Sequence, residues 1–171
     1  MFDAKVYSDR RNRLRDKIKS GLILFPGNPE VSFNYPANTY HFRQDSNFLY
    51  FFGLDHPDLA GVMDVDSGTD TVFGNDVDLD DIIWMGPQPA LSDRAARAGV
   101  KQTAPLAELL NVLAEARSKG RKIHFVPPYR GETYIQLEEL LGIPVAAIRN
   151  NVSEDLIRAV VSLRSVKDEH E

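Results

Sequence analysis

The sequence predicts an α/β domain in which helices flank one mixed β-sheet. Short apolar runs typical of strands alternate along the chain with segments of helical periodicity, which is the pattern of an α/β fold. The tight turn Asp66-Ser67-Gly68 between two of these runs indicates an antiparallel pair, so the sheet contains both strand directions. A chain of 171 residues has the length of one domain.

A first helix is expected over residues 8–20, with Ser8 as its N-cap and Gly21 after its end. Many basic side chains lie in this stretch, interleaved with acidic ones and accompanied by few apolar residues. We interpret them as a solvated helix face. These basic residues are Lys5, Arg10, Arg11, Arg13, Arg15, Lys17 and Lys19.

A buried strand is expected at residues 22–25, where an apolar run is ended by Pro26 and Gly27. A loop rich in Pro and Asn follows over residues 28–38, and residues 39–42 suit a short strand. The sequence therefore predicts a strand, a long polar loop and a second strand before the next helix.

The next helix is short, and its start is marked by polar residues. Asp45 or Ser46 can cap a helix that contains residues 48–51, and Gly53 suits its end. Arg43 and Asp45 can form an ion pair at the same corner. These residues predict a strand-to-helix corner held by a cap and an ion pair.

The rest of the chain continues the alternation of strands and helices. Strands are expected at residues 60–65, 71–73, 82–85, 123–126 and 145–148. Helices are expected at residues 92–98, 105–118, 133–141 and from Ser153 onward. The charged residues 167–171 resemble the continuation of that last helix.

Composition excludes several classes of protein. The net charge is −5, whereas nucleic-acid binders usually carry a basic domain or stripe. The chain has no cysteine for disulfides or Cys-ligated metals, and no apolar run near the roughly 18 residues of a membrane span. We expect a soluble, cytoplasmic protein that binds neither nucleic acid nor membranes.

The acidic cluster Asp76, Asp78, Asp80 and Asp81 is the strongest candidate for a metal site in the sequence. It begins like a calcium loop, but the sixth position is Asp81 instead of Gly and the twelfth is Pro87 instead of Glu. We therefore interpret the cluster as a solvated acidic turn. No nucleophile, phosphate-loop or zinc-protease motif occurs, so we predict no catalytic, cofactor-binding or metal-binding residue.

Trp84, the single tryptophan, precedes Met85, Gly86 and Pro87. It can be a half-buried aromatic anchor at the end of a strand. It can also be part of a recognition surface, because rigid aromatic side chains provide contact area at low entropic cost.

Residues 40–53 carry the most specific motif. They contain an aromatic residue, then Arg43, Gln44, Asp45 and Ser46, then spaced aromatics that include Tyr50, and finally Gly53. This stretch resembles the signature of the creatinase/prolidase N-terminal domain. Further elements at residues 10–14, 55–58, 83–86 and 163–171 resemble that family in the same order. The sequence is thus similar to the creatinase/aminopeptidase P family along nearly all of its length.

This resemblance implies the N-terminal, non-catalytic domain of an Xaa-Pro aminopeptidase. The catalytic domain, with a pita-bread fold and two divalent metals, commonly manganese, is then expected beyond residue 171. The family implies that this domain shapes access to the active site and builds a homo-oligomer, with proline-containing peptides as substrates. It also implies that Trp84 lies near the active-site mouth. An Xaa-Pro dipeptidase, or a free-standing binding module of this fold, stays open.

Overall fold

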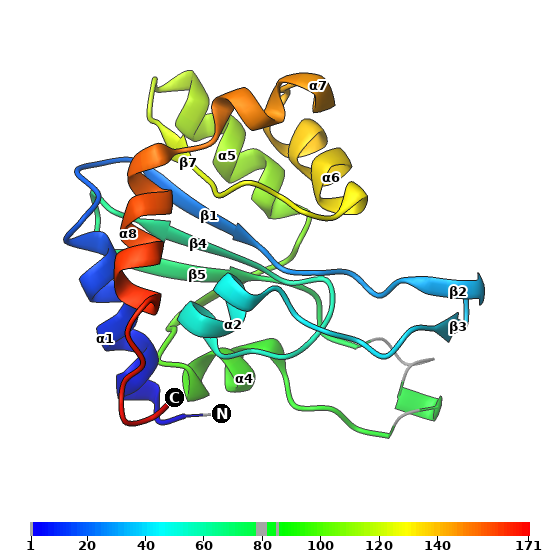
Figure 1. Cartoon of the computed structure of the whole chain (residues 1–171). Coiled ribbons are helices and arrows are strands. Elements are labelled where there is room, and N and C mark those ends of the chain that lie inside the picture. Colours follow the sequence, from blue (N-terminus) through cyan, green and yellow to red (C-terminus); the bar gives the residue numbers. More distant parts are fainter. Residues whose placement is uncertain (1, 78–81, 85) are drawn as a thin grey trace.

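The computed structural model describes residues 2–77, 82–84 and 86–171. Its centre is a five-stranded mixed sheet in the order β6-β5-β4-β1-β7 (Figure 1). The strands are β1 (Leu22–Pro26), β4 (Ala60–Asp64), β5 (Thr69–Phe73), β6 (Gln102–Ala104) and β7 (Ile123–His124). β4 runs antiparallel to β1 and β5, while β7 and β6 run parallel to the strands that they flank. The predicted mixed α/β fold is confirmed.

Helices cover both faces of this sheet (Figure 1). One face packs against α1 (Ala4–Arg15), α2 (Ser46–Phe52), α4 (Leu91–Arg97) and α8 (Glu154–Arg164). The other face packs against α5 (Glu108–Ser118), α6 (Gly131–Leu141) and α7 (Val145–Ile148), which the 3-10 turn η1 (Arg149–Asn151) follows. No helix in the described ranges is both long and apolar enough to span a bilayer.

β1 shows why the core has two halves. Ile23 and Phe25 belong to the cluster under α1 and α2, whereas Leu22 and Leu24 belong to the cluster under α5 and α6. Successive side chains of a strand point to opposite faces, so a strand that is covered on both faces is a continuous apolar run. This is the pattern that predicted β1.

The polar loop predicted for residues 28–38 is wrong in part. Residues Ser32–Tyr35 (β2) and Asn38–Thr39 (β3) form a hairpin that projects from the body of the domain (Figure 1). Every residue of β2 is exposed. Phe33 and Tyr35 do alternate with polar residues in β2, but the neighbouring Pro and Asn residues indicated a loop instead.

Two other predicted strands are helical. Residues 82–84 have helical conformation, and residues 145–148 form α7 after Pro144. Short apolar runs do not distinguish a strand from a buried helical turn by periodicity alone. The short strand β6 was not predicted.

The ends of the chain also differ from the predicted helices. α1 begins after Asp3, whose side chain accepts a hydrogen bond from the amide of Lys5, and it ends at Arg15. Ser8 lies inside the helix, where its hydroxyl donates to the carbonyl of Ala4. α8 ends at Arg164, and residues 165–171 turn back toward α1 instead of continuing the helix (Figure 1).

Candidate functional site

The start of α2 is capped by Asp45. One oxygen of this carboxylate accepts hydrogen bonds from the amides of Asn47 at 2.8 Å and Phe48 at 2.9 Å. Ser46 is the exposed first residue of the helix, so the alternative cap is wrong. Gly53 ends the helix with a φ of 66°, a left-handed conformation that glycine adopts without strain.

Gln44 joins three loops beside this cap. Its buried side-chain oxygen accepts hydrogen bonds from the amides of Asn28 and Asp45, both at 2.8 Å, and its nitrogen donates to the carbonyl of His56 at 2.6 Å. Arg43 is exposed, and its carbonyl accepts from the Asn28 side chain at 2.8 Å. The suggested Arg43–Asp45 ion pair does not form, because the Asp45 carboxylate is turned toward the helix amides. The motif is therefore a structural corner.

The solvated interpretation of the basic helix is wrong for Arg10 and Arg11, which are 1% and 0% exposed. Arg11 donates to Asp70 at 2.8 Å and to the carbonyls of Phe51, Ala98 and Gly99 at 2.8–3.1 Å. Burial lowers the pKa of Arg11, although the charge of Asp70 opposes this shift.

A sequence signal for these buried arginines exists. Tyr7, Arg10, Arg11 and Leu14 are all buried and recur at the spacing of one helix face. The guanidinium carbon of Arg10 lies 4.0 Å from the centre of the Tyr50 ring, and the Tyr50 carbonyl accepts from Arg10 at 3.2 Å. The aromatic residues of the 40–53 motif thus pack against the arginines of the 10–14 element.

Trp84 is the most exposed large hydrophobic side chain of the described residues, at 88%, and its neighbour Ile83 is 75% exposed. The interpretation of Trp84 as a half-buried anchor is therefore wrong for this chain in isolation. Met85 lies outside the described residues, and Gly86 follows with a φ of 74°. An indole this exposed is available to a partner or a substrate.

A polar groove of about 570 Å³ lies where the Trp84-bearing segment leaves and rejoins the domain. Its lining includes Glu30, His56, Asp58, Val77, Gln88 and Arg94. Burial lowers the pKa of His56, and the charge of Arg94 acts in the same direction. The groove can therefore present a neutral imidazole beside charged side chains near neutral pH.

Of the acidic cluster, Asp78, Asp80 and Asp81 lie outside the described residues. Asp76 accepts a hydrogen bond from the amide of Leu91 at 2.6 Å and so supports the start of α4. The described ranges contain no group of three or more His, Cys, Asp or Glu side chains that could hold a metal ion. The donor set of a two-metal peptidase site is thus not met by these residues.

His124 is an example of a buried structural histidine. Its ring nitrogens lie 2.7 Å from the Ser153 hydroxyl and 3.0 Å from the Ser20 carbonyl. Burial lowers the pKa of His124, and the hydrogen bond to Ser20 opposes this shift. Ser153 also caps α8, as predicted, so His124 links β7 to the start of that helix.

Comparison with known proteins identifies this arrangement. The family described as "Aminopeptidase P, N-terminal domain" matches residues 7–124. A probable Xaa-Pro aminopeptidase of Penicillium rubens is 27% identical over 89% of this chain and 29% of its own length. One from Aspergillus terreus is 26% identical over 99% of this chain and 33% of its own length. The chain thus spans about a third of these relatives.

Solved structures agree on the fold. Aminopeptidase P from E. coli, in its low-pH form, superposes with a TM-score of 0.77 at 20% identity, over all of this chain and 41% of that one. Pseudomonas aeruginosa aminopeptidase PepP gives a TM-score of 0.70 at 17% identity, over 89% of this chain and 35% of that one. The chain described here belongs to the aminopeptidase P N-terminal domain family.

Proposed function

We propose that this chain is the non-catalytic N-terminal domain of an Xaa-Pro aminopeptidase, with the peptidase site in the remainder of a longer protein. The observation that carries the proposal is the family match over residues 7–124 in a chain that spans only 29–33% of relatives named Xaa-Pro aminopeptidases. These names favour an aminopeptidase over an Xaa-Pro dipeptidase. They also favour a domain of a larger enzyme over a free-standing binding module.

The catalytic step then belongs to the absent part of the protein. The family resemblance implies two divalent metal ions there, with manganese the expected metal, held by two Asp, one His and two Glu. Such ions polarise the carbonyl of the bond before proline and supply a nucleophilic hydroxide. The described residues offer no such donor group, so the role that we assign to them is to shape access and assembly.

The proposal is tested by comparing this chain with the full-length protein. We expect residues 1–171 to fold but to release no amino acid from Xaa-Pro peptides with manganese added, whereas the full-length protein does so. Turnover by the repurified short chain would contradict the assignment. Absence of turnover by a folded, metal-loaded full-length protein would contradict it as well.

We assign Trp84 to substrate access. Its 88% exposure leaves the indole free to contact a peptide at a neighbouring active-site mouth. Misplacing a substrate by about 1 Å can cost on the order of 10²-fold in rate. In the full-length enzyme, Trp84→Ala should therefore lower kcat/KM for Xaa-Pro peptides by up to about this factor without changing Tm.

Two further variants make that experiment specific. Trp84→Phe should restore part of the activity, because it keeps an aromatic ring. Ile83→Ala changes the neighbouring side chain, which is 75% exposed, and should leave kcat/KM near the wild-type value. Unchanged kcat/KM for Trp84→Ala, or an equal loss for Ile83→Ala, would remove Trp84 from the access route.

We propose that the β2–β3 hairpin contributes to a homo-oligomer. Phe33 and Tyr35 on β2 and Tyr40 directly after β3 are 56–61% exposed, and the Phe33 and Tyr40 rings pack edge to face with centres 4.9 Å apart. Exposed apolar clusters of this kind are typical of interaction sites. Tyr35→Ser should shift the full-length protein toward smaller species in sedimentation velocity, whereas Leu110→Ser on α5 should not. An unchanged distribution for Tyr35→Ser would contradict the hairpin contact.

A further inference from the structure

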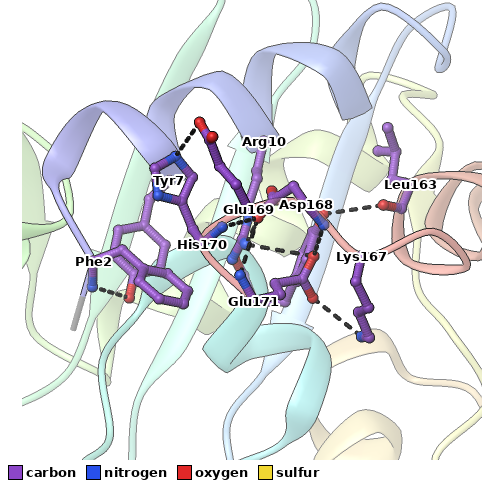
Figure 2. A network of polar contacts seen from close by, with 10 residues as sticks. Phe2, Tyr7, Arg10, Leu163, Lys167, Asp168, Glu169, His170 and Glu171 are labelled. Atoms are coloured by element: carbon purple, nitrogen blue, oxygen red, sulfur yellow. Dashed lines mark hydrogen bonds and ion pairs between the residues drawn. The ribbon is translucent and has the colours of Figure 1, made fainter.

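The last residues of the chain fold back onto the first helix. After α8 the chain reverses, so that its C-terminal end lies near α1 and the N-terminal residues (Figure 1). Figure 2 shows residues 167–171 against α1, with Asp168 and Glu171 directed toward Arg10. The carbonyl of Leu163, near the end of α8, accepts a hydrogen bond from the Tyr50 hydroxyl at 3.1 Å. Contacts before the turn, at Leu163, and after it, at Asp168 and Glu171, thus stabilise the reversal.

Arg10 is a buried cation that depends on these residues. Its side chain is 2% exposed, and its carboxylate partners among the described residues are Asp168 at 3.4 Å and Glu171 at 3.7 Å. Among the residues that the structure describes, its Nε has no hydrogen-bond partner. A buried charge without a counter-charge is costly, and removing one partner of a buried pair is strongly destabilising. Arg11, next to it, has Asp70 on β5 at 2.8 Å instead.

The aromatic surroundings of Arg10 complete a binding site. The guanidinium carbon lies 4.0 Å from the ring centre of Tyr50 and 5.1 Å from that of Phe2, so rings flank the cation. The Phe2 amide donates to the Tyr7 hydroxyl at 3.0 Å, which holds the N-terminal residues in place. The Phe2 ring also lies 6.1 Å from the ring of His170. We call Arg10, Phe2 and Tyr50 the Arg10 site.

Residues 167–171 are shaped to present two carboxylates to this site. The Asp168 carboxylate accepts from the amides of His170 at 2.9 Å and Glu171 at 3.2 Å. Lys167 pairs with Glu171 at 3.1 Å. The segment is therefore a hydrogen-bonded turn that places both acids on one side.

We propose that the Arg10 site is a docking site for the interdomain linker. Residues 167–171 bind there through Asp168 and Glu171 and so fix the direction in which the chain leaves this domain. The docking of residues 167–171 is supported by the ion pairs of Asp168 and Glu171 with Arg10. Its consequence, a fixed placement of the catalytic domain, rests on the proposed function. Neutralising both acids then frees the linker and loosens that placement.

The docking is tested on residues 1–171 by ¹⁵N relaxation. We expect order parameters for residues 168–171 close to the value of a rigid backbone, about 0.85, and below about 0.6 in the variant Asp168→Asn/Glu171→Gln. Glu169→Gln is the matched control, because it removes a charge from the same turn, whereas the ion pairs of Arg10 are with Asp168 and Glu171. Its order parameters should stay near those of the wild type. A segment that is flexible in the wild type, or rigid in the double variant, overturns the docking.

The consequence is tested in the full-length enzyme. Assayed as folded protein well below its Tm, the double variant should lower kcat/KM on Xaa-Pro peptides by several fold at unchanged metal content, and Glu169→Gln should not. If the double variant frees residues 168–171 but leaves kcat/KM unchanged, the segment does not orient the catalytic domain. If the wild-type full-length protein has no peptidase activity, the proposed function fails, while the relaxation experiment still decides whether the segment docks on Arg10.

Discussion

Replacing Arg11 should destabilise the domain far more than replacing the exposed Arg13 of the same helix. The change Arg11→Met keeps an unbranched side chain in α1 and removes a guanidinium that is 0% exposed. The lost contacts are an ion pair to Asp70 at 2.8 Å and hydrogen bonds to three backbone carbonyls at the ends of α2 and α4. Three elements that are distant in sequence are therefore affected at once.

The magnitude follows from burial. Breaking a buried ion pair by removing one partner costs about 3–5 kcal/mol. Asp70 keeps Arg15 as a partner at 2.5 Å, which lowers the ion-pair share of this cost. The carbonyls that lose Arg11 add about 1–3 kcal/mol for each buried group left unpaired, so we keep about 3–5 kcal/mol as the total. At about 2–4 °C per kcal/mol for a domain of this size, Tm should fall by roughly 6–20 °C.

Arg13→Met is the matched control. Arg13 lies two residues away on the exposed face of α1 and loses the same charge. Surface substitutions of this kind usually stay within about 0.5 kcal/mol. Urea unfolding followed by circular dichroism, with equal m-values required, measures both variants. A loss below about 1 kcal/mol for Arg11→Met, or a similar loss for Arg13→Met, would refute the argument.

Two further predictions concern a helix cap and a buried histidine. Asp45→Ala should cost about 0.5–2 kcal/mol of unfolding free energy, because the first amides of α2 lose their acceptor. Ser46→Ala, at the exposed neighbour, should leave the urea midpoint unchanged. Equal midpoints for both variants would contradict the assignment of Asp45 as the cap. Burial lowers the pKa of His124, so as the pH falls the unfolded state binds a proton at a higher pH than the folded state does. The free energy of unfolding should therefore fall as the pH drops below about 6.5. His124→Asn should lose less stability than the wild type between about pH 7.5 and pH 5.5, and equal losses would contradict this prediction.

Local sequence signals determined several elements correctly. The apolar run of β1, the turn at residues 66–68, the Asp45 cap with Gly53, and the Ser153 cap of α8 all appear where they were predicted. Each of these signals depends on residues within about one helical turn of each other, so that tertiary packing has little to decide. The 40–53 motif also indicated the family that the comparison confirms.

Tertiary structure decided the features that depend on distant partners. Arg10 and Arg11 read as solvated because their counter-charges, Asp168 and Asp70, lie 158 and 59 residues away in the sequence. Residues 82–85 and 145–148 were predicted as strands, whereas residues 82–84 and 145–148 are helical, because a short apolar run suits a strand or a helical turn until its neighbours are placed. The charges of residues 167–171 do not by themselves indicate that the chain turns back toward α1. The cation with which they pair, Arg10, is buried only when α1 packs on α2.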